Sequence, residues 1–92
     1  LIMKITEEIQ TMRVRCGWDK TDTPAMLAKS VFVEAGELLE CFQDESQPVD
    51  WSAVRSEAAD VLMYAMALCM DQGWDVEDVI RDKFADVFAR YL

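Results

Sequence analysis

The stretch Val61-Leu62-Met63-Tyr64-Ala65-Met66-Ala67-Leu68-Cys69-Met70 decides the fold of this chain, because it carries no charged residue on any side. It is about half as long as the roughly 20 residues that a membrane-spanning helix needs, so it indicates a buried helix. Such a helix must be covered on every side, and a chain this short buries only about 60% of its unfolded surface by itself. We therefore expect it at the centre of a subunit interface, in a dimer or a dimer of dimers. The alternative is a core helix wrapped by the rest of the chain.

Turn signals divide the remaining sequence into amphipathic segments. Gly17 and Gly73 are natural helix ends, and Thr23 before Pro24 gives a capping hydroxyl followed by proline at the first helical position. No β-type alternation competes with the helical pattern. The predicted helices run from about residue 2 to Gly17, from Pro24 to Gln43, from Asp50 or Ser52 to Gln72, and from Asp75 to Tyr91. These elements predict an all-α fold, a four-helix antiparallel bundle in a single domain spanning residues 1–92.

Composition narrows the class of protein. Nine Lys and Arg against 18 Asp and Glu leave a net charge of −9, which argues against binding DNA or RNA through the phosphate backbone. An acidic protein can still bind a phosphorylated small molecule through a divalent cation. Three cysteines without metal-ligand or redox spacing, and no signal peptide, indicate a reducing cytoplasm and no membrane partner.

Two pairs of carboxylates follow the same spacing on consecutive predicted helices. Glu34 and Glu37 form the first pair, and Glu57 and Asp60 form the second. Residues three apart share a helix face, so antiparallel packing brings the two pairs together. Crowded carboxylates among apolar neighbours require a cation or a proton to coexist. The alternative for each pair alone is an ordinary solvated helix face.

The absence of histidine from the sequence narrows the choice of metal. The chain has no histidine, so the imidazole ligands usual for zinc and for di-iron bundles are absent. Ligation by oxygen alone suits Mg²⁺, with Mn²⁺ possible, and Mg²⁺ commonly joins protein carboxylates to substrate phosphates. We therefore expect a phosphorylated substrate.

These residues resemble the MazG-like, all-α nucleoside triphosphate pyrophosphohydrolases, whose signature is E-x-x-E followed, after a spacer, by E-x-x-D. Upstream, Cys16-Gly17-Trp18-Asp19-Lys20-x-x-Thr23 is similar to the C-P-W-D-K/R-x-Q-T opening of MazG. The run from Glu34 to Gln43 and the position of Tyr64 are also similar to the smaller dCTP pyrophosphatase branch. The resemblance covers about residues 10 to 91.

The resemblance implies an oligomeric state, a metal site and a reaction. It implies a homodimer or homotetramer and Mg²⁺ bound by Glu34, Glu37, Glu57 and Asp60. The reaction implied is hydrolysis of a (deoxy)nucleoside triphosphate to the monophosphate and pyrophosphate, as nucleotide-pool housecleaning. Either Glu37 or Glu34 would act as the general base. The competing hypothesis is a non-catalytic helical oligomerisation or interaction module.

The resemblance also implies substrate-binding residues. Trp18 and Tyr64 match aromatic positions that hold the base; their alternatives are a loop anchor and a core tyrosine. Lys83 and Arg90 match basic residues that approach the phosphates; their alternative is a solvated face or an ion pair with Asp82 or Asp86. Lys20 and Lys29 are further candidates for phosphate binding.

Overall fold

The computed structural model describes residues 3–92, which form five helices and no strand. The helices are α1 (Ile5–Cys16), α2 (Trp18–Thr21), α3 (Pro24–Glu40), α4 (Trp51–Asp71) and α5 (Val76–Tyr91). The predicted start of the first helix near residue 2 lies outside the described residues. The all-α prediction is confirmed, with one helix more than expected. In the described part of the chain, no helix combines the length and the apolar character that crossing a membrane requires.

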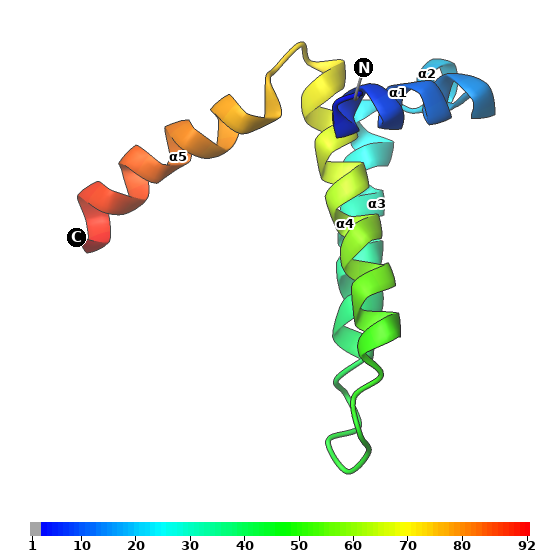
Figure 1. Cartoon of the computed structure of the whole chain (residues 1–92), viewed down its shortest axis with the longest axis vertical. Helices are drawn as coiled ribbons and strands as arrows, with labels where there is room; N and C mark the ends of the chain where they lie inside the picture. Colours follow the sequence, from blue (N-terminus) through cyan, green and yellow to red (C-terminus); the bar gives the residue numbers. More distant parts are fainter. Residues whose placement is uncertain (1–2) are drawn as a thin grey trace.

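Helices α3 and α4 form a long antiparallel hairpin (Figure 1). The Thr23 hydroxyl accepts a hydrogen bond from the Met26 amide at 3.1 Å and starts α3. Asp50, not Ser52, caps α4 by accepting from the amides of Ser52 and Ala53. The predicted end of the second helix at Gln43 is too late, because after Glu40 the backbone tightens into bonds between residues three apart.

Helices α1 and α2 cross the end of the hairpin that is far from its loop (Figure 1). Gly17 ends α1 with a φ of 74°, a left-handed conformation that glycine adopts without strain. The chain then makes one further helical turn, α2, which is the helix that the sequence did not predict. Arg13 of α1 donates to both carboxylate oxygens of Asp71 at 2.8 Å each and ties α1 to the end of α4.

Helix α5 leaves the hairpin instead of packing against it (Figure 1). Gly73 has a φ of 75° and redirects the chain after α4, and the Asp75 carboxylate caps α5 through the amide of Asp78 at 3.0 Å. No residue of α5 is buried. The expected four-helix bundle is therefore wrong for a single chain, because within residues 3–92 the apolar stripe of α5 stays exposed.

The apolar stretch 61–70 is only partly covered by the described residues. Ala67 is the one fully buried residue of α4, and Leu62 is 61% exposed. The fully buried apolar residues are few and come from different helices: Ile9, Leu27 and Ala67. One chain does not cover α4 on every side, which leaves the expected subunit interface as a proposal taken up below.

Candidate metal centre

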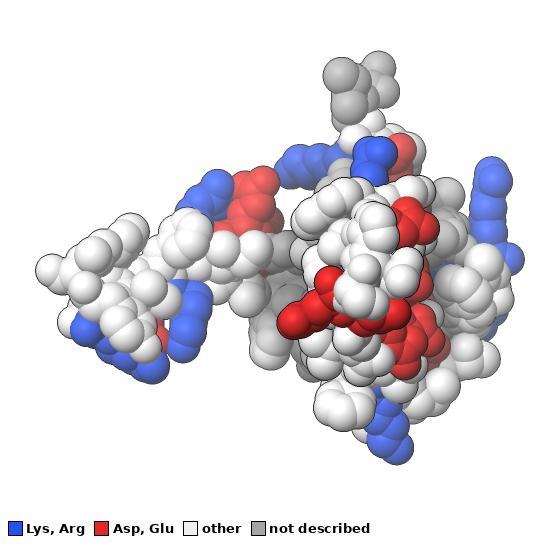
Figure 2. Space-filling model, turned by 90° about the horizontal axis from the view of Figure 1, so that it is seen from below, with Lys and Arg blue, Asp and Glu red and all other residues white. Residues whose placement is uncertain are grey.

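Three carboxylates meet on one side of the α3–α4 hairpin. Glu34 and Glu37 of α3 and Glu57 of α4 each offer an oxygen, and these atoms all lie within 4.8 Å of one another. Glu34 and Glu57 are half-buried, whereas Glu37 is exposed. In Figure 2, acidic side chains gather on the body of the molecule while most Lys and Arg side chains lie toward its edges. The i, i+3 spacing on two antiparallel helices thus brings most of the predicted acids to one point.

Within residues 3–92, two carboxylate oxygens of the cluster have no hydrogen-bond partner. Oε2 of Glu34 and Oε2 of Glu57 are buried without any hydrogen-bond partner. Buried polar atoms normally have a partner, so each of these oxygens stands where a proton or a cation would bind. The donor set contains carboxylate oxygens only, which fits the hard cations Mg²⁺ and Mn²⁺.

The raised pKa values of Glu34 and Glu57 reflect the crowding of negative charge in the cluster. Hydrogen bonding to Glu37, burial and the charges of Glu37, Asp60 and Glu57 raise the pKa of Glu34 to about 7. Burial, followed by the charges of Glu37 and Asp60, raises the pKa of Glu57. The cluster therefore resists holding its full negative charge without a counterion.

Asp60 stands beside the cluster and is not part of it. Its oxygens do not join the three that lie within 4.8 Å of one another. It lies one turn beyond Glu57 on α4, and its charge is among the causes that raise the pKa of Glu34 and Glu57. Asp60 also lines a neighbouring pocket. It therefore lies between the cluster and that pocket, within reach of a ligand that occupies both.

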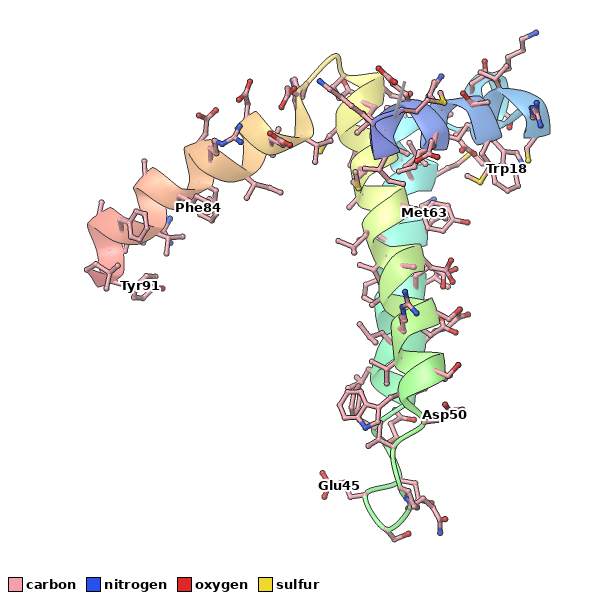
Figure 3. All side chains as sticks on the ribbon, in the orientation of Figure 1. Trp18, Glu45, Asp50, Met63, Phe84 and Tyr91 are labelled. Carbon is pink, nitrogen blue, oxygen red and sulfur yellow. The ribbon has the colours of Figure 1, made fainter. Side chains whose placement is uncertain are left out.

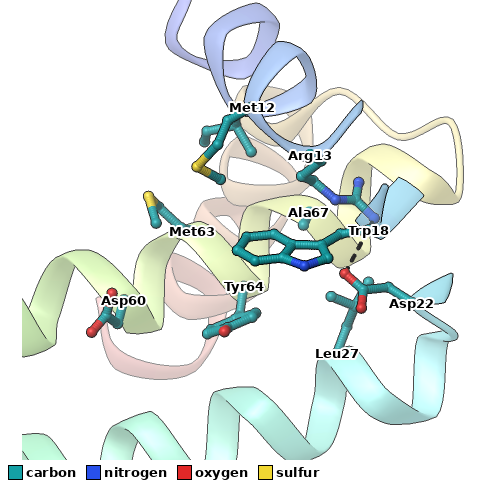
Figure 4. A pocket seen from close by; sticks show the side chains of 10 residues that line it. Met12, Arg13, Trp18, Asp22, Leu27, Asp60, Met63, Tyr64 and Ala67 are labelled. Atoms are coloured by element: carbon teal, nitrogen blue, oxygen red, sulfur yellow. Dashed lines mark ion pairs between the residues drawn. The ribbon is translucent and has the colours of Figure 1, made fainter. Parts of the chain in front are cut away.

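The pocket has a volume of about 160 Å³ and lies between α1, α2 and the hairpin (Figure 4). Trp18 and Tyr64 both line it, together with Asp60 and a set of apolar side chains. Burial, followed by the charges of Glu34, Asp60, Asp22 and Glu37, raises the pKa of Tyr64. The two aromatic residues singled out in the sequence thus share one pocket next to the acidic cluster.

Sequence reasoning missed two charged residues of this pocket, Arg13 and Asp22. Arg13 is 2% exposed and lies four residues after Ile9, so it occupies the apolar face of α1. A charged residue on an apolar face is a signal that could have been read. Asp22 follows α2 directly, and nothing in the local sequence marks it.

None of the four basic candidates lines the pocket, and no ion pair in the described part of the chain joins one of them to the cluster. Lys20 on α2 and Lys29 on α3 are exposed and do not line the pocket. Lys83 and Arg90 both pair with Asp86 at 2.8 Å on α5, as the ion-pair alternative predicted. Figure 3 shows α5, with Phe84 and Tyr91, away from the end of the hairpin where Trp18 and Met63 lie.

Comparison with known proteins associates this fold with one activity. No protein-family model matches the chain, and a search of curated proteins finds no match. Among solved structures, the chain is similar to the crystal structure of a pyrophosphatase from Archaeoglobus fulgidus DSM 4304. The TM-score is 0.82 at 30% sequence identity, over 99% of this chain and 95% of that one. The chain thus has the fold of a pyrophosphatase, with a carboxylate cluster able to bind a divalent metal.

Proposed function

We propose that this chain is a magnesium-dependent pyrophosphohydrolase that cuts (deoxy)nucleoside triphosphates between the α and β phosphates, releasing the monophosphate and pyrophosphate. The observation that carries the proposal is the convergence of Glu34, Glu37 and Glu57, with two buried oxygens that lack a partner. An aromatic pocket adjoins these acids, and a solved structure to which the chain is similar belongs to a pyrophosphatase.

The residues that would hold the metal are Glu34, Glu37 and Glu57, with Asp60 beside them. When bound there, Mg²⁺ or Mn²⁺ supplies positive charge that offsets the carboxylates and the oxygens of the substrate phosphates. The acids of the chain fix where this charge lies, since two of them come from each helix of the hairpin. The triphosphate is therefore directed to the acidic side of the hairpin.

Two carboxylates are candidates for moving a proton. Glu34 has a pKa of about 7, which suits proton exchange near neutral pH. Glu37 is exposed at the edge of the cluster, where water has access. We assign to one of these two the role of orienting the attacking water and accepting its proton. The Glu34→Gln and Glu37→Gln variants separate the two assignments, because only the variant of the base changes the pH profile of kcat.

The base of the nucleotide is assigned to the pocket that Trp18 and Tyr64 line. Trp18 is 44% exposed although its ring is large and apolar, so a flat heterocycle could cover it. Aromatic side chains bind such rings by stacking or edge contacts. Asp60 lines the same pocket and thereby links the base site to the metal site.

The apolar surface that one chain leaves open supports a homodimer or homotetramer. Phe32 is 80% exposed and Trp51 is 68% exposed on the hairpin, and Phe84 and Phe88 are each more than half exposed on α5. Soluble monomers rarely expose so much apolar surface. A second copy would cover it, and it could also bring Lys83 and Arg90 to a triphosphate that the acids of the first copy hold. Lys20 and Lys29 are the cations available within the same chain.

The role we assign is removal of unwanted nucleotides in the cytoplasm. The exposed apolar surface also favours a second candidate, a non-catalytic oligomerisation module in which the acids carry no metal. The two candidates differ in their response to magnesium, because a ligand that binds only the folded state stabilises it by about 2.7 kcal/mol at 100 times its dissociation constant.

The decisive experiment combines turnover with stability. The common ribo- and deoxyribonucleoside triphosphates are each incubated with the protein and Mg²⁺, and pyrophosphate and monophosphate are quantified. We expect equal amounts of both products, and about a 10²-fold loss of kcat or more in Glu57→Gln, since one group that stabilises transition-state charge is commonly worth that much. Mg²⁺ should raise the melting temperature of the unmodified protein and not of the variant. Pyrophosphate release that survives in Glu57→Gln, or a protein indifferent to Mg²⁺, would contradict the proposal.

A further inference from the structure

The pocket contains an acid that the proposed function leaves without a role. Asp22 lines it, and its side chain is 19% exposed. Among residues 3–92, no donor forms a hydrogen bond with the Asp22 carboxylate, and its one ion pair joins Oδ2 to Nη2 of Arg13 at 3.9 Å. That distance exceeds a hydrogen bond. The carboxylate therefore keeps free acceptor positions at the wall of the pocket.

Arg13 does not hydrogen-bond with Asp22, since Nη1 and Nη2 pair with Asp71 and, among residues 3–92, its buried Nε has no partner. Nη1 donates to Asp71 at 2.8 Å and to Gln10 at 3.1 Å, and Nη2 donates to Asp71 at 2.8 Å. This two-bond pairing holds the guanidinium in a fixed plane. Arg13 thus keeps a positive charge close to Asp22 without occupying its acceptor positions.

The position of Asp22 in the pocket is opposite to that of Asp60. In Figure 4, Asp60 lies at one end, Asp22 lies near Arg13 at the other, and the rings of Trp18 and Tyr64 lie between them. A cavity of about 150 Å³ is known to hold a six-membered ring, and this pocket has about 160 Å³. A nucleotide whose phosphates lie at the acidic cluster would place the outer edge of its base toward Asp22.

We propose that Asp22 is the residue that selects the base, by accepting a hydrogen bond from an amino group on the outer edge of a pyrimidine ring and disfavouring a ring with a carbonyl there. This inference rests on the proposed function. An ionised carboxylate only accepts hydrogen bonds. An amino group donates to it, whereas a carbonyl oxygen at the same place meets it as a second acceptor and leaves both unpaired. The amino-bearing pyrimidine is therefore the better substrate.

The test compares two pyrimidine nucleotides that differ at this group and at the neighbouring N3, which is an acceptor in cytosine and an N–H donor in uracil. We measure kcat/KM for dCTP, which carries the amino group, and for dUTP, which carries the carbonyl. The unmodified protein should prefer dCTP by about tenfold or more, the usual size of an effect from a hydrogen bond to a charged group in a partly open site. In Asp22→Asn the side-chain amide can rotate and donate to the carbonyl, so the preference should fall to about threefold or less. Asp82→Asn, at an exposed position of α5, should leave the preference unchanged.

A second measurement uses only the unmodified protein and does not depend on the folding of a variant. The triphosphate of the 2-pyrimidinone deoxyribonucleoside has hydrogen in place of the amino group or the carbonyl. Its kcat/KM should lie between those of dCTP and dUTP, because it neither donates to Asp22 nor repels it. An analogue no worse than dCTP would overturn the proposal.

The outcomes separate this inference from the proposed function. If Asp22→Asn hydrolyses both nucleotides with the same ratio of kcat/KM for dCTP and dUTP as the unmodified protein, the role of Asp22 is overturned. The proposed hydrolase function is then unaffected. A change in the preference between CTP and dCTP alone would mean that Asp22 contacts the sugar, and would also overturn it. If the unmodified protein releases no pyrophosphate from any nucleotide, the proposed function fails and the role of Asp22 fails with it.

Discussion

The hairpin end of the molecule and helix α5 carry similar apolar residues but differ in what those residues contact. Where α1 and α2 cross the hairpin lie the fully buried residues, the pocket lined by Trp18 and Tyr64, and the half-buried ion pair between Arg13 and Asp71. Helix α5 has no buried residue, and its ion pairs join residues of the same helix. The difference shows that the pocket is formed within a single chain, whereas the apolar side chains of α5 remain uncovered in residues 3–92.

The largest effect is expected from breaking the apolar stripe of α5. Phe84 and Phe88 are more than half exposed, with ring centroids 6.3 Å apart. If a second copy covers them, Phe84→Asp places a charge in an apolar contact and should raise the dissociation constant of the assembly at least about 100-fold. Sedimentation velocity over a range of concentrations measures this change.

The matched control is Asp82→Asn on the same helix, which should leave the assembly unchanged. If the unmodified protein sediments as a monomer at concentrations well above those in the cell, α5 has no self-association to lose. A partner other than a second copy of the chain would then have to cover the apolar stripe of α5.

The next effect concerns the ion pair that closes the hairpin end. The Arg13 side chain is 3% exposed and that of Asp71 is 28% exposed, and the Arg13 guanidinium holds the pKa of Asp71 below its ordinary value. Arg13→Met should reduce the free energy of unfolding by about 2 kcal/mol, less than a fully buried pair would lose, because water still reaches Asp71. Chemical denaturation measures the loss.

Two variants sharpen this result. Arg13→Lys keeps the charge but cannot form the two parallel bonds, so it should recover only part of the stability. Arg81→Met removes exposed pairs with Glu77 and Asp78 on α5, and should change the stability far less than Arg13→Met, because water screens exposed ion pairs. Equal losses in Arg13→Met and Arg81→Met would remove the distinction between the two regions.

The smallest expected effect is on the pH dependence of stability in the metal-free protein, because water reaches the cluster and screens it. The pKa of Glu34 rises from 4.5 to about 7 on folding, so between these values the folded state holds more protons than the unfolded state. Stability should therefore fall as pH rises from about 4.5 to about 7, and level off above. No histidine titrates in this window. Thermal unfolding in EDTA measures the slope.

The control for this prediction is Glu34→Gln, which should flatten the slope, whereas Glu45→Gln in the loop after α3 should leave it as it is. Added Mg²⁺ should also flatten the slope, since the cation then replaces the proton. A slope that persists in Glu34→Gln would assign it to groups outside the cluster.

Local signals predicted most of the helices. Thr23 with Pro24, Asp50, and Asp75 start helices where the sequence placed them, because capping depends only on adjacent residues. The pairing of Glu34 and Glu37 with Glu57 was also predictable, since helix periodicity and a short connection fix which faces meet. The extra turn at Trp18–Thr21 was missed, because the propensity of so short a segment is weak.

The sequence by itself determined the helical class and the acids that meet, because both follow from spacing along one or two neighbouring helices. Only the tertiary structure decided that Asp60 lies beside the cluster, that Arg13 and Asp22 line the pocket, and that α5 leaves the hairpin. These features depend on contacts between distant segments, such as Arg13 with Asp71, and on the direction that the chain takes after Gly73. Periodicity within one helix does not encode either.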